Sequence, residues 1–73
     1  MHEAHWRKPV QAGGRAIHNP LEAIRFMDRE WPGKKTMSFA EAHQACLAAL
    51  DGREPADGAR ASFKDAVDEA QVH

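Results

Sequence analysis

The sequence predicts an α+β fold in which a short N-terminal β-hairpin packs on three amphipathic α-helices, in the order β-β-α-α-α. Three observations predict this fold. The glycine pair Gly13–Gly14 separates two short segments that contain apolar residues. Two cap sequences, Asn19–Pro20 and Ser38–Glu41, each precede apolar residues at helical spacing. A third run of this kind follows Pro55. We therefore expect one small α+β domain over residues 1–73.

The hairpin is predicted at the N-terminal end of the chain. Residues 1–5 are polar and show no periodicity, so we expect them to be frayed. The segments Trp6–Ala12 and Ala16–His18 flank the two glycines, which suit the positive φ angles of a tight hairpin turn. Pro9 cannot donate a ladder hydrogen bond, which places its strand at an edge. A lone hairpin is marginally stable in water, so it is expected to lie on the helices.

The first helix has a strong start signal. Asn19 is the expected N-cap, Pro20 takes the first helical position, and Glu22 completes an arrangement like a capping box. The helix is expected to end near Trp31, because Pro32 pushes the preceding residue out of the α region. The expected inward stripe consists of Leu21, Ala23, Ile24, Phe26, Met27 or Asp28, and Trp31.

The second helix is predicted to begin at a capping box formed by Ser38 and Glu41, and to end at Gly52. Its expected inward face consists of Phe39, Ala42, Ala45, Cys46, Leu47, Ala49 and Leu50. Because Leu50 falls on this face, Leu50→Ala is expected to destabilise the protein by about 2 to 5 kcal/mol.

The third helix is predicted to open at Arg53–Pro55, with Asp57 placed favourably at the positive end of the helix dipole. Gly58 is a poor helix former, so a start at Ala59 is the alternative. The expected inward stripe consists of Ala56, Ala59, Phe63, Ala66 or Val67, and Ala70. Phe63→Ala is likewise expected to lower the free energy of unfolding by about 2 to 5 kcal/mol.

Composition excludes several classes of protein. The 73 residues include 10 lysines and arginines against 11 aspartates and glutamates, so no global charge favours nucleic acid or anionic membranes. The single cysteine, Cys46, cannot form an intramolecular disulfide, which favours a reducing, cytoplasmic location. The N-terminus lacks the apolar run of a signal peptide, and no stretch approaches the roughly 20 apolar residues of a membrane span. We expect a cytoplasmic protein that does not enter the membrane.

Five segments, taken in order, carry a resemblance to a known family. They are Lys8–Val10, Asn19–Ala23, Glu30–Gly33, Ala45–Gly52 and Ala59–Phe63. Together they resemble the bacterial domain of unknown function 982 family, over nearly the whole chain. The resemblance implies a compact α+β unit. It implies no activity, cofactor or catalytic residue that can be carried over to this sequence.

The histidines and the cysteine are the residues best suited to site chemistry. His2 and His5 have a spacing found in metal sites, but they lie on the expected frayed end, and zinc requires ligands held by ordered elements. Cys46 follows His43 by one helical turn, as a nucleophile and its base do in some sites. However, Cys46 falls on the apolar stripe, where a buried thiol behaves as a small hydrophobe. We therefore expect no metal, no cofactor and no enzymatic activity.

Aromatic residues next to basic residues provide one hypothesis about binding. Such pairs bind single-stranded nucleic acid by stacking on bases and contacting phosphates. The residues that this alternative uses are Trp6, Arg7, Lys8, Trp31, Lys34 and Lys35. The competing interpretation places both tryptophans in the core, and no known nucleic-acid-binding signature occurs in the sequence.

The leading hypothesis is a non-enzymatic protein-interaction or regulatory module. A short edge strand and alanine-rich helices suit association with another protein or with a second copy as a homodimer. The alternative is a monomer whose apolar stripes all meet in one core. A small-molecule sensor would need a cavity that a domain of this size can scarcely hold.

Overall fold

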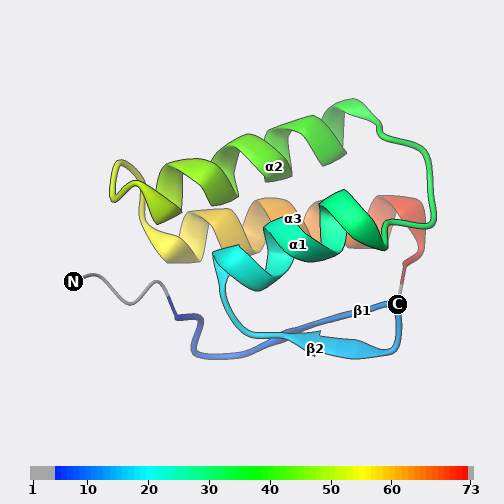
Figure 1. Cartoon of the computed structure of the whole chain (residues 1–73), viewed down its shortest axis with the longest axis horizontal. Helices are drawn as coiled ribbons and strands as arrows, with labels where there is room; N and C mark the ends of the chain where they lie inside the picture. The colour runs from blue at the N-terminus through cyan, green and yellow to red at the C-terminus, as the bar shows by residue number, and fades with distance from the viewer. Residues whose placement is uncertain (1–4, 73) are drawn as a thin grey trace.

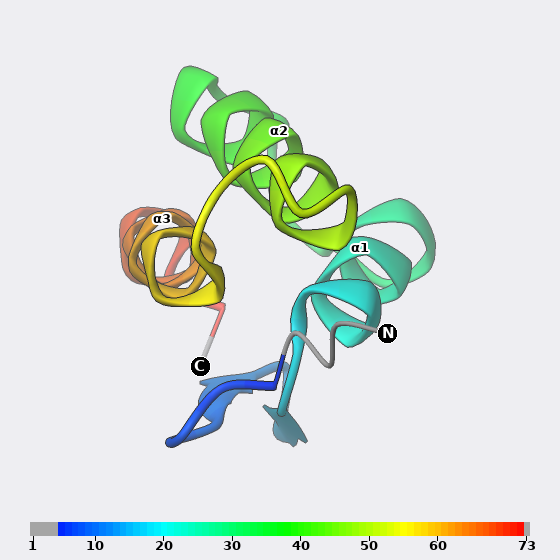
Figure 2. The ribbon, with the colours of Figure 1, turned by 90° about the vertical axis from the view of Figure 1, so that its left-hand side faces the viewer.

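The computed structural model of the protein describes residues 5–72 and confirms the predicted order β-β-α-α-α. The elements are β1 (Val10–Ala12), β2 (Arg15–Ile17), α1 (Pro20–Arg29), α2 (Met37–Leu50) and α3 (Ala56–Ala70). Helix α2 lies across α1 and α3, and the hairpin covers the side of α1 and α3 that faces away from α2 (Figures 1 and 2). The predicted frayed end falls almost entirely outside the described residues.

The hairpin forms around the glycine pair, as predicted. The strands pair antiparallel, with Val10 opposite Ile17 and Ala12 opposite Arg15. Gly13 and Gly14 have φ angles of 57° and 77°, and two successive positive φ angles are typical of the two-residue turns that join twisted strands. Each strand is only 3 residues long. β1 is shorter than the predicted segment Trp6–Ala12, and β2 begins and ends one residue before the predicted segment Ala16–His18.

The hydrophobic core is centred on Phe63 of α3, whose side chain is fully buried. Its ring lies 5.8 Å from the ring of Trp6, 6.4 Å from that of Phe26 and 6.5 Å from that of Trp31, measured between centroids. The N-terminal segment, α1, the connection after α1 and α3 therefore meet at one aromatic cluster. The predicted stripe of α3 is confirmed, since Ala59, Phe63, Ala66 and Val67 are all buried. Because α3 begins at Ala56, the alternative start at Ala59 is wrong.

Helix α1 has the predicted N-cap. The Oδ1 atom of Asn19 accepts a hydrogen bond of 2.8 Å from the backbone N–H of Glu22. The Glu22 carboxylate in turn accepts from the backbone N–H of His18, one residue before the cap, and this bond holds the pKa of Glu22 below its usual value. The helix ends at Arg29, slightly before the expected boundary near Trp31.

Asn19→Ala is expected to lower the free energy of unfolding by about 1 kcal/mol, because one N–H of the first helical turn loses its acceptor. Urea unfolding monitored by circular dichroism measures the change. Asn19→Ser is the control, since serine keeps an acceptor oxygen at the cap. If both variants unfold at the same urea concentration, the cap contributes nothing specific to stability.

The predicted start of α2 at Ser38 is wrong, because the N-cap is Thr36. The Oγ1 atom of Thr36 accepts from the N–H of Phe39, while Ser38 lies inside the helix. Both hydroxyls donate to the carboxylate of Glu69 at the end of α3, over 2.7 and 2.8 Å. These two bonds hold the pKa of Glu69 below its usual value. A contact between residues 31 positions apart thus occupies the hydroxyl that the local pattern assigned to the cap.

The leucines are the main exception to the predicted core. Leu21, Leu47 and Leu50 are 43%, 38% and 41% exposed. The inward face of α2 is formed instead by Phe39 and by small residues, namely Ala42, Cys46, Ala48 and Ala49. Small side chains let α2 approach α3 closely, so the bulky leucines remain at the rim. The prediction that Leu50 is a buried residue is therefore wrong, and the large cost expected for Leu50→Ala loses its basis.

Candidate functional site

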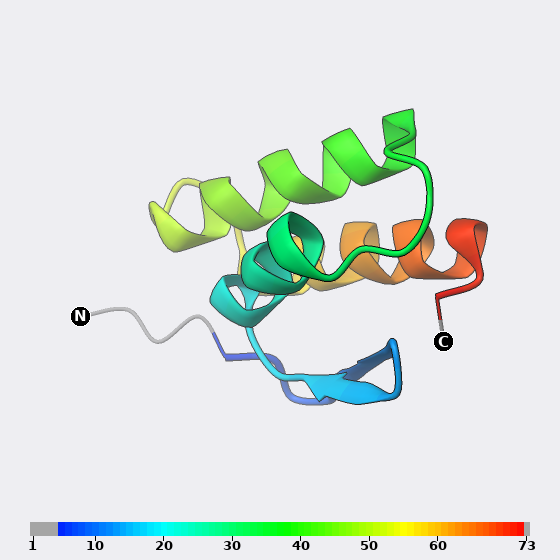
Figure 3. The same cartoon turned by 45° about the vertical axis from the view of Figure 1, so that its right-hand side comes forward.

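The two helices α1 and α2 form the most distinctive surface of the protein. They run in opposite directions, so the start of α1 lies at the same end of the molecule as the end of α2 (Figures 1 and 3). Near the other end, the Nε2 atom of His43 lies 2.9 Å from the Oδ1 atom of Asp28. Both side chains are partly exposed. This contact identifies the sides of the two helices that face each other at the surface.

The three exposed leucines lie along the seam, by which we mean the line where the facing sides of α1 and α2 meet at the surface. Leu21 precedes Asp28 by two helical turns, and Leu47 and Leu50 follow His43 by one and two turns. Because α1 and α2 are antiparallel, all three leucines fall at the same end of the seam. We call this group the leucine end.

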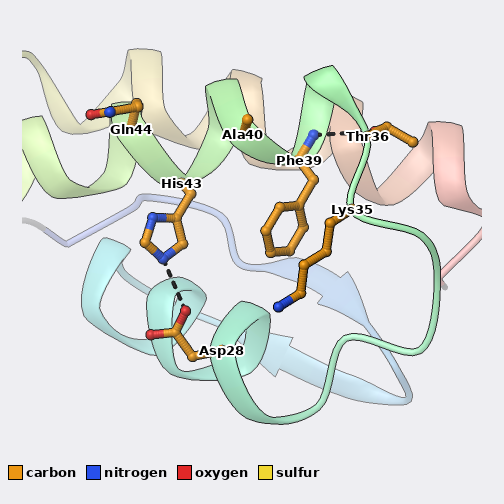
Figure 4. A pocket seen from close by; sticks show the side chains of 7 residues that line it. All are labelled: Asp28, Lys35, Thr36, Phe39, Ala40, His43 and Gln44. Atoms are coloured by element: carbon orange, nitrogen blue, oxygen red, sulfur yellow. Dashed lines mark hydrogen bonds and ion pairs between the residues drawn. The ribbon is translucent and has the colours of Figure 1, made fainter.

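A hollow of about 440 Å³ occupies the opposite end of the seam. It is lined by Asp28, Lys35, Thr36, Phe39, Ala40, His43 and Gln44. Figure 4 shows the Phe39 ring between the side chains of Lys35 and His43, with His43 directed toward Asp28. The Lys35 Nζ atom lies 5.6 Å from the centroid of the Phe39 ring, and the His43 ring stacks on it at 6.1 Å. We call this feature the Phe39 hollow, and with the leucine end it forms the α1–α2 face.

A pairing of Cys46 as nucleophile with His43 as base depends on an accessible thiolate. The Cys46 side chain is fully buried, and burial raises the pKa of its thiol to about 12, so the reactive thiolate is absent near neutral pH. The prediction that Cys46 packs as a small hydrophobe is confirmed. Between residues 5 and 72, no group of three His, Cys, Asp or Glu side chains is placed to hold a metal ion. His2 and His73 lie outside the described residues.

The six residues of the nucleic-acid alternative do not form one surface. Trp6 is only 1% exposed, because its ring packs on Phe63 and its indole N–H donates to the carbonyl of Ala56. Trp31 is partly buried and meets the Phe39 ring edge-on at 5.1 Å. The remaining basic residues are Arg7, Lys8, Lys34 and Lys35. The first two belong to the segment before β1 and the last two to the connection between α1 and α2, and these two segments lie at opposite ends of the molecule (Figure 1). Bases therefore cannot stack on Trp6, and the basic residues that would contact phosphates lie in two separate places.

Sequence reasoning missed the exposed leucines, although one signal was available. The small residues Ala42, Cys46 and Ala49 already form a complete inward stripe on α2, at intervals of one helical turn. Leu47 lies outside that stripe, and its exposure follows once the small residues are taken as the core positions. Leu50 shares a helix face with the buried Phe39, eleven residues earlier, but it is exposed at the last position of the helix.

Between residues 5 and 72, none of the helices has the length and apolar character needed to cross a lipid bilayer. No curated protein matches this chain. It is similar to the protein Atu1219 of Agrobacterium tumefaciens, whose NMR structure was determined in a structural genomics programme. The two share 28% sequence identity with a TM-score of 0.79, and the match covers 94% of this chain and 74% of the other. The model of the protein family of unknown function DUF982 matches residues 8–73, and the chain therefore belongs to this family.

Proposed function

We propose that this protein is a non-enzymatic interaction module that uses the α1–α2 face as its contact surface, with a second copy of the chain as its partner. The observation that carries the proposal is the pairing of a protruding leucine end with the Phe39 hollow on one face. A lone, buried Cys46 also suits the reducing cytoplasm, where we place the protein.

The two halves of the face complement each other when two copies meet in opposite directions. A two-fold interface places the same patch of both copies in contact. With the axis near His43 and Asp28, the leucine end of each copy meets the Phe39 hollow of the other. The methyl group of Ala40 and the edge of the Phe39 ring, a residue that is only 7% exposed, offer apolar contacts to the leucines. Each histidine also comes near the carboxylate of the opposite copy.

The hairpin edge is a weaker candidate for association. Strands of 3 residues offer few backbone groups to a further strand. The N–H of Gly13 already donates to the carbonyl of Val72. Pro9, just before β1, has no N–H to donate. These features favour the α1–α2 face over the edge strand.

The size of the apolar contact indicates a weak dimer. A leucine about 40% exposed gains about 1 kcal/mol when it is covered, and a two-fold interface covers six of them, which gives about 6 kcal/mol. Association costs about 4 to 15 kcal/mol in lost freedom, so the remaining contacts must supply the balance. A standard interface uses about 800 Å² of each partner, which is about one sixth of the 4868 Å² surface of this chain. We expect a dissociation constant in the micromolar to millimolar range.

Sedimentation equilibrium over a concentration series up to about 1 mM tests the proposal. Wild type is expected to change from monomer to dimer within the series. Leu47→Ser is expected to raise the dissociation constant at least about tenfold, because each dimer loses two apolar contacts.

Met37→Ser is the matched control for this experiment. Met37 is 78% exposed, more than Leu47, but it does not line the Phe39 hollow. Its dissociation constant is expected to stay within about twofold of wild type. A wild-type protein that remains monomeric throughout the series would overturn the proposal. So would an equal effect of both variants, which would indicate unspecific hydrophobic association.

A further inference from the structure

A second hollow lies between the N-terminal segment and the start of α3, and basic side chains dominate its lining. Its volume is about 240 Å³, and it is lined by Arg7, Lys8, Asp57 and Arg60. We call it the Arg60 hollow. Among these residues, three carry a positive charge and one carries a carboxylate. The sequence shows Arg7 and Lys8 as neighbours, but Arg60 joins them only through the fold.

Long-range hydrogen bonds hold this arrangement in place. The Nε atom of Arg60 donates to the carbonyl of Lys8 over 2.8 Å, which orients the guanidinium group. The indole N–H of Trp6 donates to the carbonyl of Ala56 over 2.9 Å. The backbone N–H of Trp6 donates to the backbone carbonyl of His18, also over 2.9 Å. Because Trp6 is buried, these bonds anchor the backbone that carries Arg7 and Lys8. The guanidinium group of Arg60 and the backbone of Arg7 and Lys8 are thus positioned before any ligand arrives, which lowers the entropy lost on binding.

The three cations of the hollow have no ion-pair partner among residues 5–72, unlike several other cations of the protein. Arg15, Arg53 and Lys64 each pair with a carboxylate. In contrast, no carboxylate in the described part of the chain lies within ion-pair distance of Arg7, Lys8 or Arg60. The side chain of Asp57 lines the same hollow without pairing to them. The positive charge is therefore available to an anion.

We propose that the Arg60 hollow binds the phosphate or diphosphate group of a small molecule. Arginine guanidinium groups match phosphate oxygens with paired N–H donors, and a lysine adds a compact point charge. With the carboxylate of Asp57 included, the lining still carries a formal charge of +2, which favours a ligand with two or more negative charges over a singly charged one. The volume of about 240 Å³ suits one or two phosphate groups better than a large ligand. This site is independent of the proposed self-association, because it uses no residue of the α1–α2 face.

Pyrophosphate is the probe that tests this proposal. The full-length protein labelled with ¹⁵N is titrated with sodium pyrophosphate at constant ionic strength. Saturable shifts are expected for the Arg60 Nε–H, the backbone amides of Arg7 and Lys8, and the indole N–H of Trp6. Lys8→Gln is expected to weaken binding about fivefold, since its exposed ammonium group contacts the anion. Arg60→Gln is expected to weaken it at least as much.

Lys34→Gln is the matched control, because it removes the same charge at the opposite end of the molecule. Its affinity for pyrophosphate is expected to stay within about twofold of wild type. Unsaturable shifts, or equal losses in Lys8→Gln and Lys34→Gln, would overturn the proposal. A parallel titration with single-stranded oligonucleotide separates the sources of phosphate. Binding of the oligonucleotide without binding of pyrophosphate would also overturn it. The amide spectrum of each variant reports whether its fold is intact.

Discussion

Replacing Phe63 with alanine is expected to lower the free energy of unfolding by about 3 to 5 kcal/mol. The ring is fully buried and contacts Trp6, Phe26 and Trp31, so its removal leaves a cavity at the point where four segments meet. A domain of this length has a total stability of about 4 to 11 kcal/mol. The variant is therefore expected to lose a large fraction of its stability at 25 °C, as measured by urea unfolding.

Leu50→Ala is the contrasting variant for this prediction. Leu50 is 41% exposed at the last position of α2, so its truncation is expected to cost only about 1 to 1.5 kcal/mol in the monomer. The measurement is made at low protein concentration, where self-association does not contribute. Similar losses in the two variants would contradict the arrangement in which the aromatic cluster, and not the leucines, forms the centre of the core.

Gly13→Ala is expected to destabilise the protein by about 2 to 4 kcal/mol, through two separate effects. Gly13 has a φ angle of 57°, which is unfavourable for alanine. A Cβ atom at this position would also lie only 2.9 Å from Cε1 of Phe26, whose ring is buried and cannot move aside. The hairpin would have to lift from the helices to relieve this contact. Thermal unfolding measures the loss.

Gly14→Ala isolates the first effect, the cost of a positive φ angle. Gly14 also has a positive φ angle, 77°, but a Cβ atom there would meet no atom within 4 Å. This variant is expected to lose only about 1 to 2 kcal/mol from backbone conformation. If Gly14→Ala is as unstable as Gly13→Ala, the close approach between the turn and Phe26 does not limit the position of the hairpin.

The elements that sequence reasoning predicted well are those specified by neighbouring residues. Gly13–Gly14 supplies the turn, Asn19–Pro20 starts α1, and Gly52, with a φ angle of 76°, follows the end of α2. Each of these signals acts within a few residues, so it can be interpreted without the tertiary structure. The same holds for the stripe of α3, where one buried phenylalanine is flanked by small residues at helical spacing.

The features that could not be predicted depend on contacts between distant residues. Ser38 has the right neighbours for an N-cap, but Glu69 takes its hydroxyl. Trp6 suits a surface site by sequence, but Ala56 and Phe63 draw it into the core. Arg60 joins the basic pair at the N-terminus through the carbonyl of Lys8, 52 positions away. In each case a tertiary partner decides between two locally acceptable positions.

The exposed leucines connect the fold to the proposed function. A core built from alanines, one cysteine and aromatic rings leaves larger aliphatic side chains at the rim of α1 and α2. Exposed apolar groups that gather on one face mark an interaction surface more often than scattered ones do. The similarity to Atu1219 and the family match support the fold of this scaffold. The proposed contact with a second copy uses its α1–α2 face.

The most direct test of the contact surface is an isotope-filtered NOE measurement on a mixture of ¹³C-labelled and unlabelled protein. The sample is prepared at a concentration where sedimentation detects the dimer. Intermolecular contacts are expected between the methyl groups of Leu21, Leu47 and Leu50 in one copy and the ring protons of Phe39 in the other. Intermolecular contacts confined to β1 and β2, or contacts between the leucine ends alone, would contradict the proposed arrangement of the two copies.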